Sequence, residues 1–200
     1  MRPRTVRLVR HAAHGALGHR LCGRQPGVRL SDQGRAEAQA LARRLAGLGV
    51  TRVLASPMER ARETAEPIAE ACGAAVETEP ALNEIDFGEW TGAAFEALDA
   101  DPRWRAWNAD RGRTRPPGGE AMTQAQARMA AWLARCATDE DEAPLAAVSH
   151  ADVIRAAVAH VLGLPLHFYD RFDIAPASIT TLELTDAGPR LLRLNEVVHD

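Results

Sequence analysis

Two histidines in the chain each follow a short run of strand-forming residues of the kind that forms a buried strand. His11 follows residues 6–10, and His150 follows residues 145–149. In an open α/β sheet, the carboxyl ends of parallel strands meet at one edge, and ligands bind there. We therefore expect both imidazoles to lie at that edge. The alternative for the first strand end is that Arg10 and His11 simply meet solvent.

Two arginines should accompany the histidines. Arg10 directly precedes His11, and Arg60 falls in the first turn of a helix that Ser56 and Pro57 are predicted to open. Serine is a preferred helix cap, and proline is favoured in the first helical turn. Guanidinium groups bind anions with several oxygens, and a helix N-terminus adds further N–H donors. These residue types together predict a cationic pocket for an oxyanion.

The elements that must position these residues alternate along the chain. Residues 31–46 have apolar side chains at helical spacing, residues 51–55 and 75–78 are predicted strands, and a helix from Ser56 to about residue 72 joins those two strands. Strand, helix, strand at this spacing indicates crossover connections and a mostly parallel sheet in an α/β fold. Residues 178–185 and 191–197 are separated by the turn 186–189, which predicts a hairpin at the sheet edge.

Residues 85–120 have no clean periodicity. We interpret them as an insertion over the active site, within a single domain that spans residues 1–200. Apolar residues between 95 and 107 suggest helix there, and residues 110–120 read as a loop. The region also holds a basic cluster whose setting among acids, prolines and glycines is typical of a solvated loop rather than a closed clamp. The cluster comprises Arg103, Arg105, Arg111, Arg113 and Arg115.

Composition narrows the function classes. The 24 basic residues are all arginine, and the net charge of -3 gives no general reason to expect a nucleic acid or an anionic membrane as partner. Cys22, Cys72 and Cys136 are far apart and have no metal-ligand spacing, as expected in a reducing compartment. The apolar run near the start is too short for a signal peptide or a membrane span, so we expect a cytoplasmic protein. No acidic trio accompanies the histidines and no nucleotide phosphate loop is present, so we expect neither a metal nor a cofactor.

Six segments, taken in order, resemble the motifs of the histidine phosphatase superfamily, also called phosphoglycerate mutase-like. The resemblance covers residues 5–185 and implies a three-layer α/β/α sandwich with a mostly parallel central sheet and an antiparallel edge strand. Its motifs are Leu8-Val9-Arg10-His11, the helix start at residues 34–39, the segment 56–65, Leu82-Asn83-Glu84 with residues 87–92, the segment 117–120, and Val148-Ser149-His150.

The resemblance also implies a role for each matching residue. His11 would be the nucleophile that becomes phosphohistidine, Arg10 and Arg60 the phosphate clamp, and His150 a donor to the phosphoryl oxygens. Glu84 would protonate the leaving oxygen, with Glu89 as the nearby rival. A carboxyl group desolvated by aromatic neighbours could hold the required proton, since burial raises its pKa.

The chain departs from the family pattern in two places. Alanines follow both histidines where the family usually has glycine, so the backbone there should avoid positive φ. The loop after His11 looks shortened and lacks the asparagine that commonly binds phosphate. His14, or the backbone at Cys22 and Gly23, could replace that contact. A surface position for His14 is the alternative.

The resemblance favours a phosphatase that acts on a small phosphorylated metabolite. A phosphoglycerate mutase is the second enzyme reading, and a phospho-ligand-binding module without catalysis is the reading from another class. No motif identifies the substrate. The exposed edge of the final hairpin leaves a homodimer open.

Overall fold

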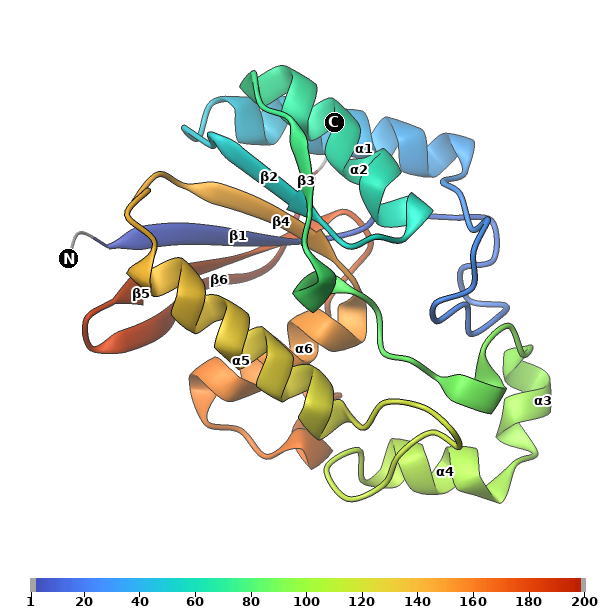
Figure 1. The fold of residues 1–200 in the computed structure, drawn as a ribbon. Helices are drawn as coiled ribbons and strands as arrows, with labels where there is room; N and C mark the ends of the chain where they lie inside the picture. The colour runs from blue at the N-terminus through green and yellow to red at the C-terminus, as the bar shows by residue number, and fades with distance from the viewer. Residues whose placement is uncertain (1–2, 199–200) are drawn as a thin grey trace.

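The computed structural model describes residues 3–198 and contains a six-stranded sheet with helices on both faces (Figure 1). The strand order is β3-β2-β4-β1-β5-β6. The first four strands in this order are parallel, while β5 runs antiparallel to both β1 and β6. The strands are β1 (Arg4–Arg10), β2 (Arg52–Ala55), β3 (Val76–Thr78), β4 (Leu145–Ser149), β5 (Ser178–Thr185) and β6 (Gly188–Val197).

Helices cover the two faces of the sheet and create two apolar cores. Helices α1 (Asp32–Ala46) and α2 (Glu59–Cys72) pack on one face, and α5 (Met122–Thr138) and α6 (Ala151–Leu162) pack on the other (Figure 1). Strand β1 serves both cores by alternation, because Leu8 belongs to the α5–α6 core and Val9 to the α1–α2 core. The predicted three-layer α/β/α sandwich is therefore confirmed.

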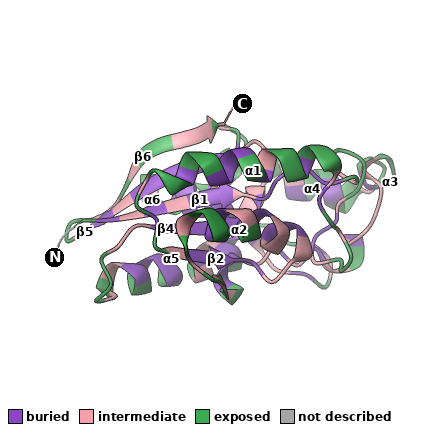
Figure 2. Ribbon diagram, turned by 90° about the horizontal axis from the view of Figure 1, so that it is seen from above, coloured by how far each residue is buried: buried purple, intermediate pink, exposed green. Residues whose placement is uncertain are grey.

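Burial follows this layering. Figure 2 shows buried residues on the central strands and on the helix faces that turn toward them. Every residue of β4 is buried, as expected for a strand covered on both faces. The edge strand β6 has only intermediate and exposed residues, among them Leu192 and Val197 at 43% and 42% exposure. The hairpin lies at the sheet edge as expected, with its antiparallel strand β5 one place inside. Whether this edge supports a homodimer stays a prediction.

The helix after β2 begins later than the sequence predicted. Met58 occupies the N-cap of α2 and makes no side-chain cap, so Ser56 is not the capping residue. The Ser56 hydroxyl instead contacts a histidine 94 positions away in the sequence. A serine followed by proline and a helical pattern is a good local signal for a helix cap. Ser56 instead forms a hydrogen bond with a buried residue that is distant in the sequence.

The region of residues 85–120 packs against the sheet and its helices. It contains two short helices, α3 (Phe95–Asp99) and α4 (Pro102–Ala109), where the sequence suggested one. Its aromatic side chains Phe87, Trp90, Trp104 and Trp107 are buried in the same core as α5 and α6. Within residues 3–198, no helix has both the length and the apolar character needed to cross a membrane.

Candidate active site

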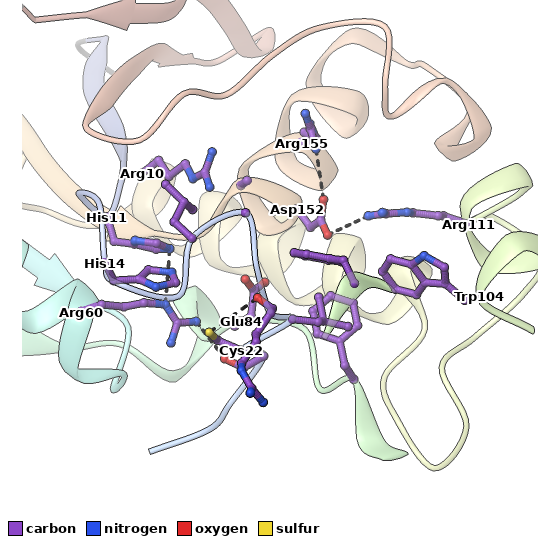
Figure 3. A pocket seen from close by; sticks show the side chains of 18 residues that line it. Arg10, His11, His14, Cys22, Arg60, Glu84, Trp104, Arg111, Asp152 and Arg155 are labelled. Carbon is purple, nitrogen blue, oxygen red and sulfur yellow. Dashed lines mark hydrogen bonds and ion pairs between the residues drawn. The ribbon is translucent and has the colours of Figure 1, made fainter. Parts of the chain in front are cut away.

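A pocket of about 260 Å³ lies at the carboxyl ends of β1 and β4 (Figure 3). It brings together all five residues predicted to carry the chemistry, although His150 lies just behind the pocket wall rather than on it. Its lining includes Arg10, His11, His14, Cys22, Gly23, Arg60, Glu84, Trp104, Arg111, Asp152 and Arg155.

His11 is held in one orientation and one tautomer. Its backbone N–H continues the parallel pairing by donating to the Ser149 carbonyl at 2.9 Å. Its Nδ1 lies 2.9 Å from the carbonyl oxygen of Ala12, which can only accept, so Nδ1 carries the proton. The ring is only 4% exposed. Nε2 is therefore the ring nitrogen that carries the lone pair.

The backbone after His11 is fixed by a residue that the sequence did not single out. The amide of Ala12 donates to the Thr64 hydroxyl at 3.0 Å. No alanine after either histidine has positive φ, since the positive-φ residues other than glycine between 3 and 198 are Ala177 and Asn195. The expected avoidance of positive φ is confirmed.

Arg60 links the two histidines from the first turn of α2. Its Nε donates to His11 Nε2 at 3.3 Å, and its Nη2 approaches His150 Nδ1 at 3.1 Å and the Gly23 carbonyl at 2.8 Å. The residue is 1% exposed, and its Nη1 makes no hydrogen bond to any residue between 3 and 198. Arginine has donors only, so this buried N–H is available to an anion.

Arg10 faces the same pocket from the end of β1 (Figure 3). Its Nη1 donates to the Ile174 carbonyl at 2.6 Å, which anchors the guanidinium. Its Nε is buried without a hydrogen-bond partner among the described residues. A buried polar group without a partner is costly, and two such groups at one pocket indicate a site for an anionic ligand.

Both active-site histidines are neutral near pH 7. Burial lowers the pKa of His11 well below its ordinary 6.5, and the positive charges of Arg60 and Arg10 lower it further. Burial and the charge of Arg60 likewise lower the pKa of His150 well below 6.5. The two rings lie 5.2 Å apart between centroids, in an edge-on arrangement.

Glu84 has the environment of a proton donor. Its Oε1 accepts the N–H of Ile85 at 2.9 Å, and its Oε2 lies 3.6 Å from His150 Nδ1. Burial raises the pKa of Glu84 to about 7, and the negative charge of Asp152 adds to the rise. The rival Glu89 is exposed, pairs with Arg103 at 3.3 Å and does not line the pocket.

The loop after His11 places a third histidine in the pocket. His14 is 7% exposed, so the alternative of a surface histidine is wrong. Its ring centroid lies 5.3 Å from that of His11, and its Nδ1 is buried without a partner in the described chain. Burial lowers its pKa to about 4, which leaves it neutral at pH 7. A neutral ring can still donate one hydrogen bond.

Cys22 and Gly23 also lie at the pocket. The Cys22 thiol is buried, and burial raises its pKa. Gly23 has φ of +51°, and a Cβ there would come within 3.1 Å of the Thr91 hydroxyl. Its carbonyl accepts from Arg60. The backbone carbonyl of Gly23 therefore helps to position the Arg60 guanidinium of the phosphate clamp.

The expectation of a fully solvated arginine cluster is wrong for Arg111. This residue is 6% exposed, pairs with Asp152 at 2.7 Å, and its guanidinium lies over the Tyr169 ring at 3.8 Å. Arg155 joins the same carboxylate at 3.4 Å. Burial raises the pKa of Asp152, but the two guanidiniums outweigh this effect and hold it below its usual range. The other four members of the cluster are exposed, namely Arg103, Arg105, Arg113 and Arg115.

Sequence reasoning missed Arg111, Asp152 and Arg155 as pocket residues. The available signal was the position of Asp152 two residues after His150, with Arg155 one helical turn further on. Across residues 3–198, the structure has no group of three or more histidine, cysteine, aspartate or glutamate side chains placed to hold a metal ion.

Comparisons with known proteins identify the family of this chain. Residues 6–197 match the model of the histidine phosphatase superfamily (branch 1). The chain therefore belongs to the histidine phosphatase superfamily. It is 33% identical over 181 residues to the Erwinia tasmaniensis protein named "Probable phosphoglycerate mutase GpmB", covering 89% of this chain and 84% of that protein.

Solved structures extend the likeness. The native structure of a mycobacterial glucosyl-3-phosphoglycerate phosphatase superposes with a TM-score of 0.87 and 27% identity, over 98% of this chain and 100% of that one. The same enzyme in complex with inorganic phosphate gives a TM-score of 0.82 at 26% identity, with coverage of 98% and 100%. The chain is thus similar both to a protein named as a mutase and to a phosphatase.

Proposed function

We propose that the protein hydrolyses phosphomonoesters of small metabolites through a phosphohistidine intermediate on His11. The environment of His11 is the observation that supports this proposal best. The Ala12 carbonyl holds the proton on Nδ1, and the lowered pKa keeps the ring neutral, so Nε2 carries a lone pair that can attack phosphorus once the Arg60 Nε–H turns to the phosphoryl group. A neutral imidazole beside cationic groups is a competent nucleophile for a phosphoryl group.

The guanidiniums of Arg10 and Arg60 would bind the phosphoryl oxygens. Transfer through a loose transition state depends mainly on positioning and on stabilising charge. Arg60 Nη1 and Arg10 Nε are the buried N–H groups available for this purpose. The mycobacterial phosphatase, which shares this fold, has been solved in complex with inorganic phosphate, and this supports phosphate as a ligand.

Glu84 would move the proton in both half-reactions. In the first, the bond from His11 Nε2 to phosphorus forms while the ester P–O bond breaks, and the Glu84 carboxyl gives its proton to the leaving oxygen. In the second, the Glu84 carboxylate takes a proton from water as the water oxygen attacks phosphorus. The N–P bond then breaks and leaves inorganic phosphate and neutral His11. A pKa of about 7 suits both directions.

A phosphoglycerate mutase is the second candidate, favoured by the GpmB relative and by Arg111 and Arg155 at the pocket. A mutase must hold a second anionic group while the bisphosphate intermediate turns over. These two arginines already face Asp152, and Arg155 also lies 3.7 Å from Asp173. Two acids thus balance the two guanidiniums, and hydrolysis is the better-supported outcome.

The discriminating experiment is a phosphate-release assay on a panel of phosphorylated metabolites and one aryl phosphate. We expect release without a bisphosphoglycerate primer and negligible interconversion of 3- and 2-phosphoglycerate. Primer-dependent interconversion with little free phosphate would establish the mutase instead. Phosphate binding without any turnover would identify a binding module. The same screen would name the substrate.

We also propose a cytoplasmic location. Cys22, Cys72 and Cys136 are all free thiols, as expected for a protein of a reducing compartment. Treatment of intact cells with a membrane-permeable alkylating reagent, followed by denaturation in the presence of that reagent, tests this directly. Full labelling is expected, and disulfide-blocked cysteines would contradict the proposal.

A further inference from the structure

Ser56 makes a buried hydrogen-bonded link to His150 that none of the roles above requires. The residue is fully buried at the end of β2, and its Oγ lies 2.8 Å from His150 Nε2. The same oxygen accepts the backbone N–H of Met58 at 3.3 Å and lies 3.4 Å from Asn83 Oδ1. Three partners fill the capacity of a hydroxyl group, which has one proton and two lone pairs.

The direction of every hydrogen bond in this chain of groups follows from the obligate donors at its ends. Arg60 has no acceptor, so its Nη2 must donate to His150 Nδ1 at 3.1 Å. Nδ1 therefore bears a lone pair, and the proton of the neutral ring is on Nε2. Nε2 then donates to Ser56 Oγ, whose own proton points to Asn83 Oδ1. Asn83 Oδ1 also accepts the N–H of Glu84 at 2.9 Å, which requires the amide oxygen of Asn83, and not its NH2 group, at this position.

We propose that Ser56 is a positioning residue of the phosphate clamp: it keeps the proton of His150 on Nε2, so that Nδ1 can hold the guanidinium of Arg60. The opposite tautomer would place an N–H of His150 against an N–H of Arg60 at 3.1 Å, a repulsive contact. Arg60 in turn donates to His11 Nε2. Ser56 thus acts through His150 on the group that faces both the nucleophile and the anion.

The inference changes the expected part of His150 in the free protein. The resemblance implied a donor to phosphoryl oxygens, whereas the hydrogen bonds give Nδ1 the role of acceptor for Arg60 before an anion binds. The inference rests on the proposed function only in naming phosphate as the ligand of the clamp. The tautomer itself is a property of the protein without substrate.

The tautomer can be measured by nitrogen NMR on the full chain labelled with 15N-histidine, with His150→Asn used to assign the signals. We expect a protonated Nε2 and an unprotonated Nδ1 for His150 in the wild type. Ser56→Ala should shift the population toward protonated Nδ1, and Ser56→Thr, which retains the hydroxyl, should restore the wild-type pattern. Ser178→Ala is the matched control, because the buried Ser178 hydroxyl has no hydrogen-bond partner in the described chain.

Phosphate binding provides the second readout. Loss of one charge-assisted contact should weaken inorganic phosphate binding by Ser56→Ala on the order of tenfold, with Ser178→Ala unchanged. If Ser56→Ala does not fold, Ser56→Cys, whose sulfur is a weak acceptor, replaces it. A wild-type His150 protonated on Nδ1, or an unchanged tautomer in Ser56→Ala or in its replacement Ser56→Cys, would overturn the proposal. A wild type that releases no phosphate would refute the proposed function while leaving the NMR result valid.

Discussion

Replacing Glu84 by glutamine should make the stability of the protein less dependent on pH. The ionised carboxylate is disfavoured in the folded chain because burial and the charge of Asp152 raise its pKa from 4.5 to about 7. Its side chain is 13% exposed. A glutamine oxygen can keep the hydrogen bond from the Ile85 amide at 2.9 Å. The substitution therefore removes the titration and retains the contact.

The sign of the effect follows from proton binding. Below pH 4.5 the carboxyl group is protonated in both the folded and the unfolded chain. Between pH 4.5 and about 7, the unfolded chain loses this proton and the folded chain keeps it, so the wild type loses stability as pH rises. The full difference in pKa corresponds to about 3 kcal/mol, of which about 2 kcal/mol falls between pH 5 and pH 8.

Urea unfolding of the wild type and Glu84→Gln at pH 5 and pH 8 measures this effect. We expect the variant to gain about 2 kcal/mol relative to the wild type on going to pH 8, because other titrating groups cancel in the comparison. Glu89→Gln serves as control, since Glu89 is exposed and its pairing with Arg103 lies on the surface. If the free energy of unfolding has the same pH dependence in the wild type and in Glu84→Gln, then Glu84 is not a buried carboxyl group that stays protonated in the folded protein.

Three further outcomes test separate parts of the site. Glu84→Gln should impair turnover of alkyl phosphates far more than that of aryl phosphates, whose leaving group needs no proton; a selective loss in Glu89→Gln instead would transfer the role of acid to Glu89. Arg111→Gln should lower the free energy of unfolding in urea by about 3 kcal/mol, because it leaves Asp152 buried without its 2.7 Å partner. The control Arg113→Gln, at a side chain that is 89% exposed, should change this free energy by less than about 0.5 kcal/mol. Similar effects of the two substitutions would contradict the buried pair. His14→Ala should weaken competitive inhibition by inorganic phosphate about fivefold, the loss of one hydrogen bond, and an unchanged inhibition constant would place His14 outside the phosphate contacts.

The strand-end histidines could be located from sequence because their positions depend on local patterns. Short runs of strand-forming residues predict β1 and β4, and parallel pairing between these strands brings His11 and His150 to one edge. Arg60 follows in the same way from the start of α2. Glu84 is different, since its segment has no periodicity, and only the family resemblance pointed to it.

The residues that sequence reasoning placed wrongly are those whose environment comes from distant parts of the chain. Arg111 sits among residues typical of a solvated loop, and its burial depends on Asp152 and Tyr169 from later elements. Ser56 has a good local cap signal, but its partner His150 is 94 positions away. No pattern in the sequence around Arg111 or Ser56 indicates either contact.

Trapping of the phosphoenzyme tests the central claim most directly. Brief incubation with a labelled phosphomonoester, followed by a denaturing quench, should leave label on the protein that is lost in acid and retained in alkali. His11→Ala should carry no label and lose several orders of magnitude in turnover, as expected for removal of a nucleophile, whereas Cys22→Ala, which lacks the pocket thiol, should still be labelled. Acid-stable label, or His11→Ala with substantial turnover, would contradict phosphoryl transfer through His11.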